Sequence, residues 1–353
     1  MKASDEKPAV SVADAAEVSQ NIPQRGSAAS ISRRARRRRH LIEATILPIA
    51  WVAVFIAFGM LLPQTYPTVA NVATMLASQA VLVVVTLGLL LPLTAGDFDL
   101  SMGSVVGLSA MVIAQLNVQA HWPVGYAVLA ALALGLMVGA VNAFFTMVMG
   151  VQSLIVTLGS GTLVLGITLW ISGSQTVSGV SYDLVNPTII DRLFGVPLEF
   201  YYALALCLVV WYLFERTPVG RRLLIVGRGP VVARLSGISV GRVRAGALIA
   251  SGLIAAFGGV LYAGTSASAA PTGGQEFLLP AFAAAFLGAT TVKPGVFNPV
   301  GSTIAVYFLV FGVTGLEFLG APTYVQDVFY GAALILAVTF SQLVRRSEGT
   351  ARS

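Results

Sequence analysis

Long apolar runs, separated by short polar connections, fill most of this chain from residue 44 to near its C-terminal end. A helix needs about 20 predominantly apolar residues to cross the hydrocarbon core of a membrane. Measured against that length, the pattern predicts ten membrane-spanning helices. They are expected at approximately 44–62, 70–93, 101–119, 123–149, 153–172, 200–214, 245–264, 276–292, 299–317 and 323–343. The predicted fold class is therefore all-α, a polytopic membrane protein with about ten transmembrane helices.

The composition agrees with this interpretation and excludes an ordinary soluble domain. Of the 353 residues, 56% are hydrophobic and 10% are charged, and the mean hydropathy is +0.85. A soluble domain typically has about 25% charged residues. The net charge of +6 is concentrated at the N-terminus, in one internal loop and near the C-terminus. This distribution is typical of orientation signals and of attraction to anionic lipid, rather than of nucleic-acid binding.

Charge and hydropathy together predict three regions. Residues 1–40 are predicted to form a disordered basic tail, residues 41–344 the transmembrane domain, and residues 345–353 a C-terminal tail. The first tail ends in a basic cluster of Arg33, Arg34, Arg36, Arg37, Arg38, Arg39 and His40. A nucleic-acid-binding arm has a similar composition, but a basic block directly before a first span favours an orientation signal. Because basic segments stay inside and the number of predicted spans is even, both termini are predicted to be cytoplasmic.

The internal basic loop, residues 215–244, carries seven arginines and the single acid Glu215. Pro230 suits the first turn of a helix, and Gly237 can end that helix in a left-handed conformation. Between and beside them, apolar side chains recur at helical spacing: Val231, Val232, Leu235 and Ile238. The pattern predicts a short amphipathic helix on the cytoplasmic side. Two interpretations stay open, a loop that only fixes topology and a docking surface for a cytoplasmic partner.

The sequence contains no recognisable catalytic residues. His40 and His121 both lie outside the predicted spans, there is no H-E-x-x-H motif, and the lone Cys207 allows no disulfide within the chain. The nucleotide-binding pattern G-x-x-x-x-G-K-[ST] is absent as well. We therefore expect no catalytic residue, no metal and no cofactor. If ATP drives this protein, its hydrolysis is expected on a separate chain.

Ionisable side chains are missing from the middle of all ten predicted spans. Ion-coupled carriers usually hold such groups inside the helix bundle, despite a cost of at least ~2.5 kcal/mol each at the bilayer centre. Their absence disfavours an ion-coupled carrier, although a sodium site built from backbone carbonyls leaves that alternative open. Small residues four apart in the fourth span, at Ala131, Gly135 and Gly139, predict close packing against another helix.

The polar stretch LPLTAGDFDLSMGS, residues 91–104, interrupts two apolar runs. Pro92 is predicted to stop the second span and Gly96 to permit a turn. Asp99 or Ser101 is predicted to cap the third span by accepting free backbone N–H groups. The alternative is functional, because two carboxylates, Asp97 and Asp99, beside a helix break can shape an inner gate or an exit route for a polar substrate.

The segment 96–104 also resembles the G-G-I-D-L-S-V-G-S signature of the ribose- and galactose-type permeases, the membrane subunits of bacterial ABC sugar importers. Residues 155–159 are similar to that family's I-V-T-L-G, residues 233–238 to its A-R-L-S-G-I, and residues 251–256 to its S-G-L-x-A-A. The order and spacing hold from about residue 70 to residue 343. Two departures stand out: Asp97 replaces the second glycine, and Val231 and Val232 precede Ala233 where the family has Glu-Ala.

This resemblance implies a permease that imports a monosaccharide of the ribose, xylose or galactose type by alternating access, in the bacterial plasma (inner) membrane. The implied partners are a cytoplasmic ATP-binding subunit, an extracytoplasmic sugar-binding protein and a second permease subunit, identical or paralogous. The implied ATPase-coupling residues are Pro230, Ala233, Arg234, Leu235, Ser236, Gly237 and Ile238. The gate or pathway candidates are Asp97, Asp99, Ser101, Gly103, Ser104 and Thr157. The alternatives are an ion-coupled secondary carrier and an ABC permease for a non-sugar solute such as a nucleoside.

Overall fold

A computed structural model describes residues 45–350 of the chain, with the backbone alone beyond residue 339. The predicted tail at 1–40, with its arginine cluster, and residues 351–353 lie outside the described residues. The last helix runs to Thr350, so the boundary predicted at 344 falls within a helix.

The described chain is a succession of helices with four very short strands. In order, the elements are the helix Thr45–Leu61, α3 (Val69–Ala77), α4 (Ala80–Ala95), α5 (Met102–Ala114), η1 (Gln115–Gln119), α6 (Val124–Met147), α7 (Ser153–Ser172), β1 (Val177–Ser178), α8 (Tyr182–Val185), η2 (Asn186–Ile190), β2 (Arg192–Leu193), β3 (Val196–Pro197), α9 (Leu198–Arg216), α10 (Pro218–Arg228), α11 (Pro230–Leu235), α12 (Val240–Ser266), β4 (Ser268–Ala269), η3 (Gly273–Phe277), α13 (Leu278–Gly288), α14 (Pro299–Phe318) and α15 (Tyr324–Thr350). Strand β1 pairs with β4 and β2 with β3, both antiparallel.

Seven stretches of the described residues are long and apolar enough to cross a membrane. They are Val69–Ala95, Met102–Gln119, Val124–Met147, Ser153–Ser172, Leu198–Arg216, Val240–Ser266 and Pro299–Phe318. Two shorter apolar helices, Thr45–Leu61 and Tyr324–Thr339, coincide with the first and last predicted spans. The span predicted at 276–292 is the 11-residue helix α13 with the turn η3 before it. The all-α polytopic class is confirmed, and the number ten remains a prediction.

The predicted end of the second span at Pro92 is wrong, because α4 continues through that proline to Ala95. Proline removes one backbone donor but does not end a helix inside a membrane protein when neighbouring elements support it. The helix ends at Gly96, whose φ of 89° places it in the left-handed region, and the Asp97 N–H closes the turn on the Pro92 carbonyl at 2.9 Å. The turn predicted at Gly96 is therefore confirmed.

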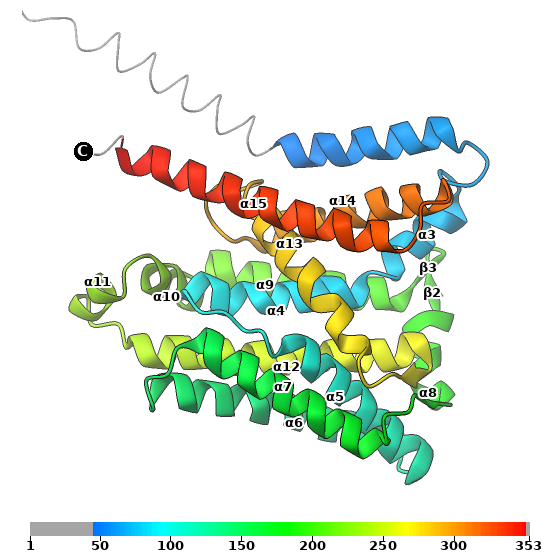
Figure 1. The fold of residues 1–353 in the computed structure, drawn as a ribbon, viewed down its shortest axis with the longest axis horizontal. Coiled ribbons are helices and arrows are strands. Elements are labelled where there is room, and N and C mark those ends of the chain that lie inside the picture. Colours follow the sequence, from blue (N-terminus) through cyan, green and yellow to red (C-terminus); the bar gives the residue numbers. More distant parts are fainter. Residues whose placement is uncertain (1–44, 351–353) are drawn as a thin grey trace, which may run out of the picture. The chain divides into compact units, whose positions relative to one another are not determined.

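Helix α12 packs against α4, α5 and α6, and it lies alongside α6 in Figure 1. A Cβ atom added to Gly135 would lie 2.5 Å from the Gly252 carbonyl oxygen, and one added to Gly139 would lie 2.7 Å from the Leu248 carbonyl oxygen. Any larger side chain at these two positions would therefore force the helices apart. The close helix packing predicted from the small residues of the fourth span is confirmed.

Candidate functional site

Two consecutive helices, α10 and α11, lie within the segment 215–244, between the end of α9 and the beginning of α12, and they sit together at one end of the helices (Figure 1). Sequence reasoning missed α10, because its arginines obscure the apolar side made by Leu223 and Val226, both buried. The usable signal was the pair Thr217 and Pro218. The threonine hydroxyl caps the helix by accepting the Val219 N–H at 3.2 Å, and proline suits the first helical position.

Helix α11 begins at Pro230 as predicted, but it ends at Leu235, so Ile238, the last of the apolar residues that predicted the amphipathic helix, lies beyond it. The helix stops because Gly237 takes a φ of 77°. Its N–H donates to the Arg234 carbonyl at 3.0 Å, and the Ile238 N–H donates to the Ala233 carbonyl at 2.9 Å. These two bonds form a Schellman motif, as the predicted glycine stop implies.

The apolar side chains of α11 divide into a buried set and an exposed set. Ala233 is fully buried, and Ile238, just after the helix, packs with it against Val226 and Val240. The exposed set, which we call the α11 surface, consists of Val231, Val232 and Leu235, with exposed fractions of 66%, 61% and 85%. Arg234 and Ser236 beside them are also exposed. Ile238 is therefore an internal anchor of this segment rather than part of its outer surface.

Helix α10 packs directly against the end of α4. A Cβ atom added to Gly227 would overlap the carbonyl oxygen of Thr94, and one added to Gly96 would lie 3.6 Å from the Gly227 Cα. The backbone of α10 therefore contacts the backbone at the point where α4 ends and the segment 96–101 begins. A shift of α10 along this contact would be transmitted to that segment, since no flexible side chain lies between them.

Asp97, the next residue, forms an ion pair with Arg244 in the first part of α12. The Arg244 Nε donates to one carboxylate oxygen at 2.7 Å, and its Nη2 contacts the other. The Asp97 side chain is 1% exposed and that of Arg244 is 30% exposed. Bidentate arginine–carboxylate geometry fixes orientation as well as distance. The pair holds the segment after α4 to a helix 147 residues further along the chain.

Asp99 is fully buried and accepts three hydrogen bonds. One carboxylate oxygen accepts from the Ser101 N–H at 3.0 Å and from the Ser101 hydroxyl at 2.6 Å, and the other accepts from the Ser251 hydroxyl at 2.6 Å. Asn142 of α6 donates to the Ser101 hydroxyl oxygen at 2.9 Å. Burial raises the pKa of Asp99, which lies between two spans, while the hydrogen bonds from Ser101 and Ser251 oppose that rise.

The predicted cap of the third span does not form. The Ser101 side chain accepts no hydrogen bond from the first turn of α5, and the N–H that Asp99 accepts belongs to Ser101, the residue before the helix. Ser101 instead relays a hydrogen bond from Asn142 to Asp99. Asp99 and Ser101 therefore tie the segment 96–101 to α6 and α12, the two closely packed helices.

Ser153 and Thr157 of α7 bind the backbone of the same segment. The Thr157 hydroxyl oxygen accepts the Leu100 N–H at 3.1 Å, and Ser153 accepts the Phe98 N–H at 3.3 Å. The remaining candidates, Gly103 and Ser104, lie in the first turn of α5 and face η3. Gln275 donates to the Ser104 hydroxyl at 2.6 Å, and a Cβ added to Gly103 would lie 3.0 Å from the Gly274 carbonyl oxygen.

The structure thus brings Asp97, Asp99, Ser101 and Thr157 together around one segment, with Gly103 and Ser104 just after it. Sequence reasoning missed the partners Arg244, Ser251, Asn142 and Gln275. The sequence could have indicated Ser251, because this residue is the first of the S-G-L-x-A-A motif. No local pattern distinguishes Arg244 from the other arginines of its loop.

We expect the free energy of unfolding of Asp99→Asn to lie within about 1 kcal/mol of the parent value. The amide has the same shape as the carboxylate and can still form hydrogen bonds with Ser101 and Ser251. Asp99→Leu should cost considerably more, since each buried hydroxyl left without its partner costs roughly 1–3 kcal/mol. Thermal unfolding of the purified proteins in one detergent measures both, and equal losses would contradict the hydrogen-bonding role. Parental uptake by the Asn variant would end the hypothesis that the Asp99 charge is needed for gating.

Comparison with known proteins identifies the family. Residues 71–338 match the family model described as "Branched-chain amino acid transport system / permease component". The D-allose transport system permease protein of Escherichia coli K12 is 30% identical over 300 residues, covering 84% of this chain and 90% of the relative. The ribose import permease protein of the same strain is 31% identical over 308 residues, covering 85% and 95%.

A third relative, the autoinducer 2 import system permease protein of Salmonella typhimurium LT2, is 30% identical over 289 residues, covering 80% of this chain and 86% of the relative. No solved structure matches the chain significantly. The family match covers more than half of the chain and includes both the segment 96–101 and the helices α10 and α11. This multi-pass membrane protein belongs to the permease component family of the branched-chain amino acid transport systems.

Proposed function

We propose that this chain is the membrane-spanning subunit of a binding-protein-dependent ABC importer that carries a monosaccharide into the cell. The observation that supports this substrate class is the similarity, at about 30% identity over most of both chains, to permeases named for ribose and D-allose. The relative named for autoinducer 2 keeps a non-sugar solute as the alternative within the same mechanism.

The energy for transport is proposed to come from a separate cytoplasmic ATPase that docks on the α11 surface. The three apolar side chains of this surface are well exposed, and two exposed arginines, Arg228 and Arg234, are close to them in the sequence. Arg234, Ser236 and Pro230 would border the contact, while Ala233, Gly237 and Ile238 would keep the helix in place. In this arrangement both termini are cytoplasmic, a second permease subunit completes the pathway, and an extracytoplasmic protein delivers the sugar.

The proposed mechanism is alternating access, with force passing from α11 to the segment 96–101. Helix α10 follows the motion of α11, and its Gly227 contacts the backbone at Thr94. The Asp97–Arg244 pair and the Asp99–Ser251 hydrogen bond then tie the displaced segment to α12. Because Thr157 of α7 accepts a hydrogen bond from the same segment, moving the segment changes the contacts of α7 as well. The gate is therefore proposed at the residues from Asp97 to Ser104.

Transport by the purified complex in vesicles tests this function directly. We expect uptake of a radiolabelled monosaccharide to need the ATPase, internal ATP and the loaded binding protein, and to be unaffected by ionophores that collapse proton and sodium gradients. Uptake that continues after ATP removal and stops with the ionophore would overturn the proposal in favour of an ion-coupled carrier. A matched panel of sugars and nucleosides identifies the solute class, and ATP-dependent uptake of nucleosides alone would overturn the sugar assignment.

A further inference from the structure

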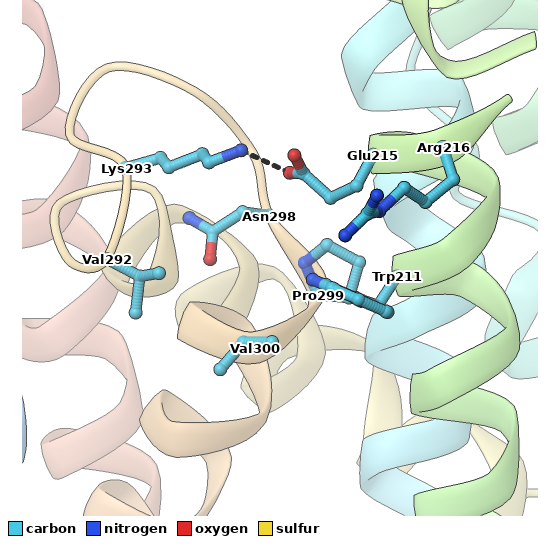
Figure 2. A pocket seen from close by; sticks show the side chains of 8 residues that line it. All are labelled: Trp211, Glu215, Arg216, Val292, Lys293, Asn298, Pro299 and Val300. Carbon is cyan, nitrogen blue, oxygen red and sulfur yellow. Dashed lines mark hydrogen bonds and ion pairs between the residues drawn. The ribbon is translucent and has the colours of Figure 1, made fainter. Parts of the chain in front are cut away.

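A cavity of about 440 Å³ opens where α9 ends and α14 begins, and none of the residues that line it is assigned a role in the proposed mechanism (Figure 2). Three segments contribute to its wall: the last turns of α9, the loop 289–298 and the first turn of α14. Its lining residues are Trp211, Glu215, Arg216, Val292, Lys293, Asn298, Pro299 and Val300.

The loop 289–298 is held in a defined shape. Val292 has a φ of 60°, which a β-branched residue rarely adopts, and the Lys293 N–H donates to the Thr291 carbonyl at 2.6 Å to form a γ-turn around it. Asn298 stabilises the turn, since its amide nitrogen lies 3.1 Å from the carbonyl oxygens of both Gly288 and Thr291. A strained turn of this kind persists only where its surroundings enforce it, and such turns concentrate at binding sites.

Two cations border the cavity, and only one of them is neutralised. Lys293 forms an ion pair with the carboxylate of Glu215 across the opening. Figure 2 shows the Arg216 guanidinium directed into the space between that pair and Trp211. No acid among the described residues lies within ion-pair distance of Arg216. The cavity therefore carries a net positive charge of one, on a guanidinium that can donate two parallel hydrogen bonds.

The cavity lies at the ends of two candidate membrane spans. Both α9 and α14 are candidate spans, and the charged residues Glu215 and Arg216 are the last residues of the first while Pro299 begins the second. Trp211, half-buried one turn before the charges, has the amphipathic ring that is enriched at headgroup depth. Basic pockets between spanning helices at this depth suit lipid headgroups.

We propose that this cavity binds the phosphate group of an anionic phospholipid, with Arg216 as its principal contact and Lys293 as a second contact when it leaves Glu215. The indole of Trp211 would then lie beside the glycerol region of the lipid. Free inorganic phosphate offers the same chemistry, but the position at the ends of two spans and the adjoining indole favour a lipid. The proposal rests on the membrane location of the chain and is independent of the transport reaction.

Native mass spectrometry of the purified permease tests the proposal by titration with phosphatidylglycerol or phosphatidylcholine of the same acyl chains. We expect tighter retention of the anionic lipid, by about fivefold for each basic side chain engaged, which corresponds to ~1 kcal/mol per Lys or Arg. Arg216→Gln with Lys293→Gln should abolish the preference. The control, Arg222→Gln with Arg242→Gln, makes the same charge change at exposed positions outside the cavity and should keep it.

Quenching of Trp211 fluorescence by brominated lipids gives an independent readout. It is measured in a variant in which the other tryptophans, Trp51, Trp122 and Trp170, are changed to phenylalanine. Brominated phosphatidylglycerol should quench Trp211 more than brominated phosphatidylcholine does.

Equal retention of the two lipids, or a preference that survives Arg216→Gln with Lys293→Gln, would overturn the proposal. The proposal would also be overturned if the same double variant kept the lipid preference but no longer bound the ATPase, because the cavity would then be a contact surface for a protein. Binding of millimolar phosphate without any preference for the anionic lipid would equally exclude the lipid.

Discussion

Leu235→Asp is expected to release the ATPase from an otherwise intact permease. Leu235 is 85% exposed, so the isolated chain loses no packing when it is replaced. In the complex, a partner groove that buries the leucine contributes roughly 1.5–3 kcal/mol, and losing that contribution alone lowers affinity roughly 10- to 150-fold. A buried carboxylate without a partner lowers affinity further. Co-purification of the ATPase, and the response of its hydrolysis to the loaded binding protein, measure the effect.

The matched control for this experiment is Phe194→Asp. Phe194 is 92% exposed in the connection between β2 and β3, so its substitution introduces the same charge at an equally exposed apolar position. We expect parental ATPase binding from this variant. If Leu235→Asp also binds the ATPase and transports at the parental rate, the α11 surface is not the docking site. The loop would then serve only to orient the chain in the membrane, which is the other interpretation of its arginines.

Breaking the Asp97–Arg244 ion pair should lower the stability of the fold by unequal amounts, depending on which partner is removed. Arg244→Met keeps most of the apolar stem but leaves Asp97, 1% exposed, as an unpaired buried charge, which costs about 3–5 kcal/mol. Asp97→Asn leaves Arg244, whose side chain is 30% exposed and can reach water, so its cost should be about 1–2 kcal/mol. Thermal unfolding in a single detergent, with uptake measured in parallel, compares the two.

The double variant, Asp97→Asn with Arg244→Met, separates the charge effect from other damage. Removing both charges eliminates the unpaired carboxylate, so the double variant should be more stable than Arg244→Met alone. Additive losses, or equal losses from the two single variants, would show that the pair does not hold the segment 96–101 to α12. Stability restored to the double variant without restored uptake would assign the pair a part in transport beyond its contribution to the fold.

Hydropathy predicted the positions of the helices because every spanning helix must present apolar side chains either to lipid or to other helices. It predicted their ends less well. Helix α12 begins at Val240 rather than near 245, since arginines at a helix end can reach water without leaving the helix. Pro92 did not stop α4, because the left-handed Gly96 is what ends that helix. The 276–292 run became the shorter α13 after the turn at Gly273–Phe277.

The candidate site was predictable in its local parts and not in its pairings. Asp97, Asp99 and Gly237 stood out because acids beside a helix break and glycine after an amphipathic run each have a local physical meaning. The partners Arg244 and Ser251 come from α12, about 150 residues away, and only the tertiary packing of α12 on α4 and α6 brings them near. Helix α10 was missed for a different reason, because its arginines, exposed at the helix surface, obscure the short apolar side made by Leu223 and Val226.

The Schellman end of α11 has a consequence for the rate at which a partner associates and dissociates. A surface whose backbone is already ordered loses less conformational entropy on binding than a loop that must fold against its partner. With the helix pre-organised by Gly237 and Ile238, changes to Leu235 should act mainly on the dissociation rate constant. The exposed arginines of α10 and α11, such as Arg221 and Arg234, should instead set the association rate and its dependence on ionic strength.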